Sequence, residues 1–353
     1  MSIRLAIVVG ARPQFIKYGS VYQALKAKQV EQLLIHTGQH YDKSMSDLFF
    51  DQLQLPKPDY NLGICNLSHA EMTGNMMSKL EEIFLSENID GVLVFGDTNS
   101  TLAGALVASK IEGLDLFHVE AGLRSFNRKM LEEINRVITD HLSNLLFCPT
   151  AVSVANLKKE GVVEGVHLVG DVMYDATLSS VQKAPPLEVI FRQLDFKEEN
   201  YALATVHRAE NTDDPRRLAE ILGYIDEQAE AAVLMPLHPR TKKRIQEFGL
   251  ELKNVYAVDP VGYLEMITLI KNAEKIYTDS GGMQKEAYFL RTPCVTLRNE
   301  TEWLETINCG WNRLWSVPDY QNRSEITEYG SGNAAQIIAD IICRYFNDRC
   351  VSK

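Results

Sequence analysis

Short runs of apolar and β-branched residues alternate with longer helix-like segments along the whole chain, and this alternation constrains the fold more than any other feature. The first half contains the runs RLAIVVG, QLLIHTG, GVLVFGD, LDLFHVEAG, NLLFCPT and GVHLVGD. The second half continues with YALATVHR, AAVLMPLHP, NVYAVDP, KIYTDSGG and TPCVTLRN. Buried parallel strands joined by helices produce this pattern. The sequence therefore predicts an α/β protein made of two doubly wound domains with a central cleft.

The length and the breaks in the pattern support two domains. The chain has 353 residues, which exceeds the size at which one hydrophobic core usually continues to grow. A helix-breaking stretch, KAPPLE, follows the last strand of the first half. We predict an N-terminal domain over 1–172 and a C-terminal domain over 173–353. The last amphipathic stretch, NAAQIIADIICRYFNDR, could pack on either of them.

Composition excludes several classes of protein. Hydrophobic residues make up 45% of the chain and charged residues 24%, which is typical of a soluble globular protein. The net charge of -11 argues against a nucleic-acid partner, which would require clustered cations. The apolar run LAIVVG is too short for a signal peptide or a membrane span, so we expect a cytoplasmic location and no membrane partner. The six scattered cysteines form no CxxC pair and indicate neither disulfides nor a metal site.

The first polar segment at a strand end is GARPQFIK. Ligands of open α/β sheets bind beyond the carboxyl ends of the strands, where this segment lies. Gly10, Arg12 and Lys17 would present backbone N–H groups, a helix N-terminus and two cations to one phosphate. A purely structural arginine at the turn is the alternative. The segment is not GxGxxG, so no dinucleotide cofactor is predicted.

The segment TDSGGMQKEA has a similar design in the second half. Ser280, Gly281 and Gly282 would let backbone amides approach a diphosphate, and Glu286 would accept hydrogen bonds from ribose hydroxyls. The alternative is an N-cap serine followed by a tight glycine turn.

A third strand end, TVHRAEN, carries His207 and Arg208. These side chains would complete a cationic lining around an anionic ligand. A single histidine can also be a structural residue without a role in the chemistry.

Carboxylates gather in HVEAGLRSFNRKMLEEINR and at the preceding strand end. Glu120 follows one predicted strand, and Asp97 ends its neighbour. Glu132 and Arg136 are four residues apart on the next helix, on the side opposite the apolar residues Leu131, Ile134 and Ile138. Three converging carboxylates would raise one another's pKa towards values useful for proton transfer. The alternatives are an exposed Glu132–Arg136 ion pair and a turn-capping role for Asp97.

These motifs together resemble a known family. GARPQFIK, FGDTNST, HVEAGLRS, EEINR, TVHRAEN and TDSGGMQKEA occur in the order and spacing of the non-hydrolysing UDP-N-acetylglucosamine 2-epimerases, over nearly the whole chain. The resemblance implies a glycosyltransferase-B-like fold of two Rossmann-like domains and a homodimer. It also implies an isomerase that needs no cofactor and interconverts the gluco and manno forms of a UDP-2-acetamido sugar.

The resemblance also implies a set of site residues. The predicted catalytic residues are Asp97, Glu120, Glu132 and His207. The predicted substrate-binding and UDP-binding residues are Arg12, Lys17, Arg136, Arg208, Met266, Ser280, Gly281, Gly282, Glu286 and Arg298. Two positions depart from the family pattern: Leu131 replaces a proline, and Met266 replaces an aromatic residue expected near uracil.

The amino-acid sequences of two segments favour one branch of the family. LRSFNRKMLEEINR and LRNETEWLET are more similar to the branch that acts on UDP-2,3-diacetamido-2,3-dideoxyglucuronate than to the branch with RTGD and ERPE. Arg124, Asn127 and Arg128 could bind the extra carboxylate and amide of that substrate. They could equally be solvated surface groups.

The chemistry of the sugar favours an elimination mechanism. Carbon 2 of an amido sugar has no adjacent carbonyl, so its proton is too weakly acidic for simple removal and return. Loss of UDP with the C2 proton would give a 2-acetamidoglycal, to which UDP adds back after protonation on the other face. The alternatives are a hydrolysing epimerase that releases free sugar and UDP, a glycosyltransferase, and a regulatory protein that binds nucleotide sugars without turnover.

Overall fold

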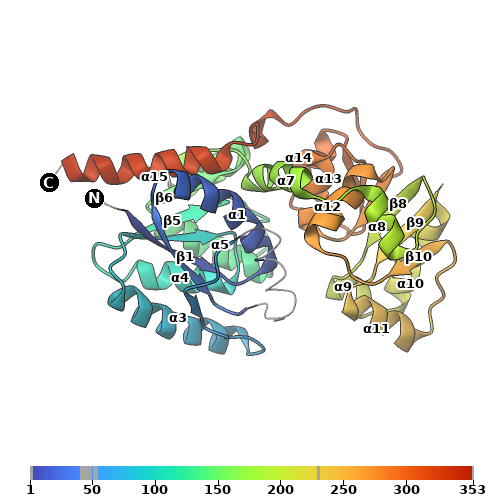
Figure 1. The fold of residues 1–353 in the computed structure, drawn as a ribbon, viewed down its shortest axis with the longest axis horizontal. Helices are drawn as coiled ribbons and strands as arrows, with labels where there is room; N and C mark the ends of the chain where they lie inside the picture. Colours follow the sequence, from blue (N-terminus) through green and yellow to red (C-terminus); the bar gives the residue numbers. More distant parts are fainter. Residues whose placement is uncertain (1–2, 40–49, 51–54, 229–230, 352–353) are drawn as a thin grey trace. The chain divides into compact units, whose positions relative to one another are not determined.

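The structure is a computed structural model that describes residues 3–39, 50, 55–228 and 231–351 (Figure 1). The chain divides into two compact units, one formed by residues 1–176 and 327–353 and the other by residues 177–326. The division falls within helix α7 (Val172–Lys183), close to the boundary predicted after residue 172. The second unit is thus an insertion between two parts of the first.

The first unit is built on a seven-stranded sheet with the order β3-β2-β1-β4-β5-β6-β7, in which every pair is parallel. Its strands are β1 (Arg4–Val9), β2 (Glu31–His36), β3 (Tyr60–Asn61), β4 (Gly91–Phe95), β5 (Asp115–Val119), β6 (Leu145–Cys148) and β7 (Val166–Leu168). The central strands β4 and β5 are buried along their whole length, which explains their uninterrupted apolar sequences. The strand order reverses at β1 and β4, where loops of such sheets bind ligands.

Helices connect these strands, and side-chain caps define where several of them begin. The helices are α1 (Arg12–Ala27), α3 (His69–Ser86), α4 (Asn99–Ala108), α5 (Leu131–Leu142) and α6 (Ala151–Lys159). Ser68 and Glu71 form a capping box at α3. Thr98 and Thr150 are the N-caps of α4 and α6, and each side chain accepts a backbone N–H three residues further along.

The last helix, α15 (Ala334–Val351), belongs to the first unit and packs beside α1, as Figure 1 shows. Both oxygens of Asp175 accept backbone N–H groups at its start, from Ala334 at 3.1 Å and from Ala335 at 2.8 Å. Further along, the Tyr345 hydroxyl donates to Asp115 Oδ1 over 3.0 Å. These contacts decide between the two positions that the sequence left open for this helix.

The second unit contains a six-stranded parallel sheet with the order β10-β9-β8-β11-β12-β13. Its strands are β8 (Tyr201–Thr205), β9 (Ala232–Pro236), β10 (Val255–Val258), β11 (Lys275–Thr278), β12 (Cys294–Thr296) and β13 (Asn312–Leu314). Its helices after α7 are α8 (Leu187–Leu194), α9 (Ala209–Thr212), α10 (Pro215–Gln228), α11 (Pro239–Phe248), α12 (Tyr263–Asn272), α13 (Gly281–Phe289) and α14 (Leu304–Asn308). Two parallel sheets of this kind confirm the predicted pair of Rossmann-like α/β domains.

Within the part of the chain that the structure describes, no helix is both long enough and apolar enough to cross a lipid bilayer.

Candidate active site

Two carboxylates meet at the carboxyl ends of β4 and β5. Asp97 follows β4 and Glu120 follows β5, and these two strands are adjacent in the sheet. Lys17 Nζ forms an ion pair with Glu120 Oε2. Arg136 Nη2 lies 2.5 Å from Asp97 Oδ2. Each carboxylate is therefore held by its own cation, one from α1 and one from α5.

The electrostatics of this pair favour proton exchange at Asp97. Burial raises the pKa of Asp97 above that of an ordinary aspartate, and the negative charge of Glu120 acts in the same direction. The positive charges of Arg136 and Lys17 oppose this but do not cancel it. A carboxyl group with a raised pKa is better suited to give and take protons near neutral pH.

The backbone around these carboxylates is strained. Glu120 has a φ of 73°, a left-handed conformation that costs a non-glycine residue about 1–2 kcal/mol. Gly96 has a φ of 61°, and a Cβ at this position would lie 3.3 Å from Glu120 Oε2. Phe147 O accepts the N–H groups of both Glu120 and Ala121 at 3.1 Å and holds the turn in place. Strain of this kind is common at functional sites.

The loop after β1 differs from the phosphate cradle that the sequence predicts. Gln14 Oε1 accepts the N–H groups of Gly10 at 2.7 Å and Ala11 at 3.0 Å, so both donors are already used. Gln14 Nε2 donates to Phe95 O over 2.7 Å and ties this loop to the end of β4. Gly10 is required because a Cβ there would lie 2.1 Å from Thr37 Oγ1. In this structure the Gln14 side chain occupies the two backbone N–H groups that the sequence assigned to a phosphate, and phosphate binding by this loop stays a prediction.

The cations of the same loop have separate positions. Arg12 is exposed at the first residue of α1. Lys17 is only 8% exposed and points to Glu120. Lys17 therefore serves the carboxylate pair in this structure, while Arg12 is exposed on the surface.

Helix α5 is oriented differently from the simple amphipathic prediction. Glu132 is exposed in its first turn, whereas Arg136 is buried and bonds to Asp97 and, at 3.4 Å, to Glu133 Oε2. The alternative of an exposed Glu132–Arg136 pair was therefore wrong. The alternative of a capping role for Asp97 was also wrong, because Thr98 is the N-cap of α4. The apolar residues on the exposed side are Leu131 and Ile134.

The second glutamate of EEINR has a structural role that the sequence did not reveal. Glu133 Oε2 accepts the Ser125 N–H at 2.8 Å, and its Oε1 accepts the Phe126 N–H at 2.9 Å. This side chain fixes the loop that leads from Glu120 to α5. Asn127 and Arg128, also in this loop, are exposed.

A buried ion network lies behind the carboxylates. His118 Nδ1 lies 2.7 Å from Asp140 Oδ1, and its Nε2 donates to Gly96 O over 2.7 Å. Arg124 Nη1 donates to Asp140 Oδ2 over 2.7 Å, and its Nε donates to Glu160 Oε1 over 2.7 Å. The Arg124 side chain is 1% exposed, so it is neither a substrate contact nor a solvated group. The network holds the carbonyl of Gly96, which precedes Asp97.

In the second unit, Asp279 at the end of β11 organises the loop after β8. Its Oδ2 accepts the N–H groups of His207 at 3.0 Å and Arg208 at 2.9 Å, and the amide of Asn211 at 3.0 Å. His207 Nδ1 lies 3.2 Å from Asp279 Oδ1. Burial alone would raise the pKa of Asp279, but these hydrogen bonds prevail and lower it. A charged Asp279 orients His207 so that its Nε2 is directed away from Asp279.

The N-terminus of α13 provides a site suited to an anion. Ser280 is its N-cap and accepts the Met283 N–H at 3.5 Å, so the capping alternative is confirmed. The tight-turn alternative was wrong, because neither Gly281 nor Gly282 has a positive φ. A Cβ on Gly281 would lie 2.6 Å from Glu302 Oε1, whereas the nearest atom to a Cβ on Gly282 is 4.0 Å away. The first turn of the helix therefore has open space at Gly282, next to N–H groups without helical acceptors.

Three further predicted site residues have side chains that are buried or partly buried in the second unit. Glu286 is 6% exposed and lies near Tyr263, whose hydroxyl has a pKa raised well above its usual value by burial and by Glu286. Met266 is partly buried and packs against the apolar core beneath α12. Arg298 is 4% exposed, and its Nη1 donates to Glu302 Oε2 over 2.8 Å.

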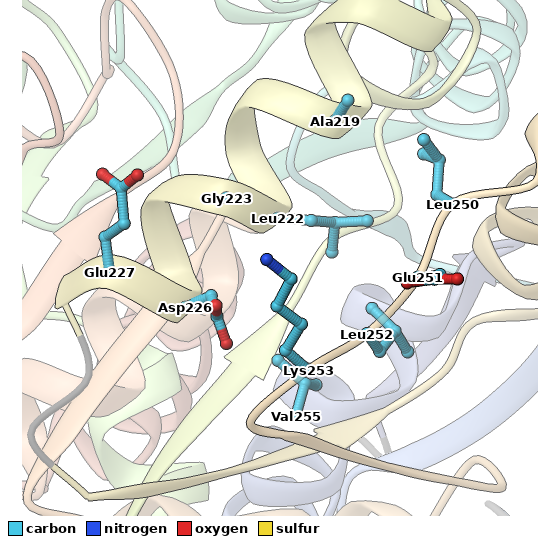
Figure 2. A pocket seen from close by; sticks show the side chains of 10 residues that line it. All are labelled: Ala219, Leu222, Gly223, Asp226, Glu227, Leu250, Glu251, Leu252, Lys253 and Val255. Atoms are coloured by element: carbon cyan, nitrogen blue, oxygen red, sulfur yellow. The ribbon is translucent and has the colours of Figure 1, made fainter.

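Two hollows are found among the residues that the structure describes, and predicted site residues line one of them. The hollow in the first unit is lined by Lys17, Val119, Glu120, Phe147, Pro149, Gly170, Asp171 and Val172. Figure 2 shows the other, between α10 and residues 250–255 of the second unit. It lies at the amino end of β10, whereas the predicted residues lie beyond the carboxyl ends of the strands. We therefore assign no part of the site to it.

Comparison with known proteins identifies the family. The family model for UDP-N-acetylglucosamine 2-epimerase matches residues 23–343. A UDP-N-acetylglucosamine 2-epimerase homolog of Methanococcus maripaludis is 48% identical over 96% of this chain and 99% of its own length. The UDP-2,3-diacetamido-2,3-dideoxy-D-glucuronate 2-epimerase of Pseudomonas aeruginosa is 46% identical over 97% and 100%.

A solved structure agrees with these relatives. The crystal structure of Methanocaldococcus jannaschii UDP-GlcNAc 2-epimerase in complex with UDP-GlcNAc and UDP matches with a TM-score of 0.86 and 42% identity. The match covers 97% of this chain and 100% of that one. The motifs, the two parallel sheets and these similarities lead to one conclusion: the chain belongs to the UDP-N-acetylglucosamine 2-epimerase family.

Proposed function

We propose that this chain is a non-hydrolysing epimerase that inverts carbon 2 of a UDP-2-acetamido sugar. The observation that carries the proposal is the pair of carboxylates at the ends of β4 and β5, each held by a buried cation. The backbone strain at Glu120 and the raised pKa of Asp97 support a role in proton transfer. A protein that only binds a diphosphate sugar has no need for two coupled carboxylates at one site.

The proposed reaction proceeds by elimination and re-addition. A carboxylate removes the C2 proton, the C1–C2 double bond forms, and the bond from C1 to the diphosphate oxygen breaks. Reprotonation of C2 on the opposite face and attack of UDP on C1 then give the epimer. Asp97, Glu120 and the exposed Glu132 form the proposed acid–base set. We assign no face to each, because coupled carboxylates share their protons.

The second unit would hold the departing diphosphate. The N-terminus of α13 offers N–H groups and the positive end of a helix dipole at Gly282. His207, oriented by Asp279, and Arg208 add donors from the loop after β8. Donors fixed in advance stabilise charge as it develops on the leaving group. Arg12 is the proposed contribution of the first unit to UDP binding.

The sugar is proposed to be of the UDP-N-acetylglucosamine type or its 2,3-diacetamido uronate. The similarity to the Pseudomonas aeruginosa enzyme supports the uronate. Of the three residues suggested for its extra groups, Asn127 and Arg128 remain exposed, whereas Arg124 is buried in the ion network. A substrate panel that includes both UDP-sugars distinguishes them.

Reaction in D2O tests the proposed function. Epimerisation should place solvent deuterium at C2 of the product, because a proton held on a carboxylate exchanges before it returns. Free UDP formed in step with free sugar would instead identify a hydrolysing epimerase. No change in either UDP-sugar, while UDP still binds, would identify a binding protein and contradict the proposal.

We also propose that the enzyme acts as a homodimer in the cytoplasm. Large apolar side chains are exposed around the start of α5, namely Phe126 at 72%, Leu131 at 48% and Ile134 at 44%. Clusters of this kind often mark interfaces between proteins. The buried Cys148, Cys294 and Cys309 are free thiols, as expected in a reducing compartment. Sedimentation equilibrium should give the mass of a dimer, and Ile134→Ser should weaken the association of the two subunits.

A further inference from the structure

Trp303 has a buried hydrogen-bond donor that the rest of the structure does not explain. This residue precedes α14 and is 7% exposed. Its indole Nε1–H is buried and has no hydrogen-bond partner within the described residues. Leaving such a group unpaired costs about 1–3 kcal/mol, so an unpaired donor in a folded protein calls for an explanation.

The position of this donor points to a ligand. Trp303 Nε1 lies 3.2 Å from where a Cβ on Gly281 would be, at the first residue of α13. It therefore lies over the helix end whose free N–H groups are suited to an anion. Lys285 Nζ lies 4.0 Å from the centre of the indole ring and is 1% exposed, so the ring is held from behind by a buried cation.

A carboxylate lies over the same point in this structure. Glu302 Oε1 is 2.6 Å from the same Cβ position on Gly281, and Glu302 Oε2 accepts a hydrogen bond from Arg298. The Glu302 side chain is 23% exposed, more than either Trp303 or Arg298. An anionic group thus already occupies the positive end of α13, next to an indole donor that it leaves unpaired.

We propose that Trp303 Nε1 donates a hydrogen bond to a diphosphate oxygen of the bound nucleotide, which takes the place of the Glu302 carboxylate over Gly281. Trp303 is then a positioning residue for the leaving group, because its indole Nε1–H has a fixed position next to the first turn of α13. The inference rests on the proposed function, since it assigns a further contact to the UDP that this function requires. It concerns nucleotide binding and can be tested without turnover.

Trp303→Phe removes the donor and keeps an aromatic ring for Lys285. We expect its affinity for UDP to fall about 10-fold or more, as for a lost hydrogen bond to a charged group. Its midpoint of thermal unfolding should change little, because removal of an unpaired buried N–H offsets the loss of buried ring atoms. Trp311→Phe is the matched control. Its indole Nε1 is also buried without a partner among the described residues, but the Trp311 ring contacts Arg291 and Arg323 instead of the α13 N-terminus.

Indole resonances of ¹⁵N-tryptophan-labelled wild-type protein give a second measurement that does not depend on how the variant folds. UDP should shift the Trp303 Nε1–H resonance strongly downfield, whereas uridine, which lacks phosphate, should not. An unmoved Trp303 resonance at saturating UDP, or equal UDP affinity of Trp303→Phe and wild type, overturns the inference. Weakened UDP binding by Trp303→Phe in a protein that epimerises no UDP-sugar would leave this inference standing and refute the proposed function.

Discussion

Gly282→Ala separates stability from ligand binding at the N-terminus of α13. The nearest atom to a Cβ at Gly282 is 4.0 Å away, so alanine fits without displacing the protein. Alanine in a helix is more stable than glycine by about 0.5–1 kcal/mol, so the variant should be as stable as wild type or slightly more so. The same methyl group would fill the space proposed for the diphosphate. Loss of one hydrogen bond to a charged phosphate costs about 1.5–3 kcal/mol, which corresponds to a fall in UDP affinity of about 10-fold to 150-fold.

Calorimetric titration with UDP and urea unfolding measure the two effects on the same preparation. Gly223→Ala is the matched control, because Gly223 lies within α10 and a Cβ there would have no neighbour within 4 Å. It should show the same small gain in stability with unchanged UDP affinity. If Gly282→Ala binds UDP within about twofold of wild type, the diphosphate does not lie over this helix end, and the reasoning is refuted.

Four other predictions follow from the described contacts. Glu132→Gln should keep UDP affinity but lower kcat by about 100-fold or more, whereas a near-normal rate would leave Glu132 as an ordinary exposed helix residue. Asp279→Asn should raise KM and lower kcat without abolishing folding, because it loosens His207 and the loop after β8; unchanged kinetics would show that this orientation is unimportant. Burial raises the pKa of Asp175 to about 6 from an ordinary 3.8, so the free energy of unfolding should fall by up to about 3 kcal/mol as the pH rises from about 4 to above 6. In Asp175→Asn, urea unfolding should not show this dependence on pH. An equal pH dependence in the variant would contradict the assignment of the effect to Asp175. Activity should persist in EDTA, because the proposed site meets the diphosphate with cations and a helix N-terminus, and loss of turnover that is restored by added Mg²⁺ or Zn²⁺ would disprove this.

The predicted strands of both sheets were found, because each depends on a local apolar run that can be read from neighbouring residues. The structure adds β3 and β13, whose sequences YN and NRL are short and polar and form no apolar run. The capping role of Ser280 was also a local matter, since the side chain and the N–H it accepts are three residues apart.

The contacts that shape the site could not be predicted from neighbouring residues in the sequence. Gln14 binds Phe95 O across 81 positions of sequence, and Asp279 binds the His207 N–H across 72, so both depend on which strands lie side by side. The orientation of α5 was misjudged because apolar residues were expected on its inner side. The buried ion pair of Arg136 with Asp97 turns that side of the helix inward and leaves Ile134 exposed.

The return of α15 to the first unit sets an order for folding during synthesis. The backbone N–H groups of Ala334 and Ala335 that Asp175 binds leave the ribosome only after the whole of residues 177–326 has been made. The second unit is continuous in sequence and can complete its sheet while translation is still in progress. Synthesis of the first unit begins earlier, but its α1 and β5 cannot make their contacts with α15 until that helix has left the ribosome. Its final packing therefore comes after that of the second unit, and a released chain that ends at residue 333 should be cleaved by protease in the first unit while the second resists.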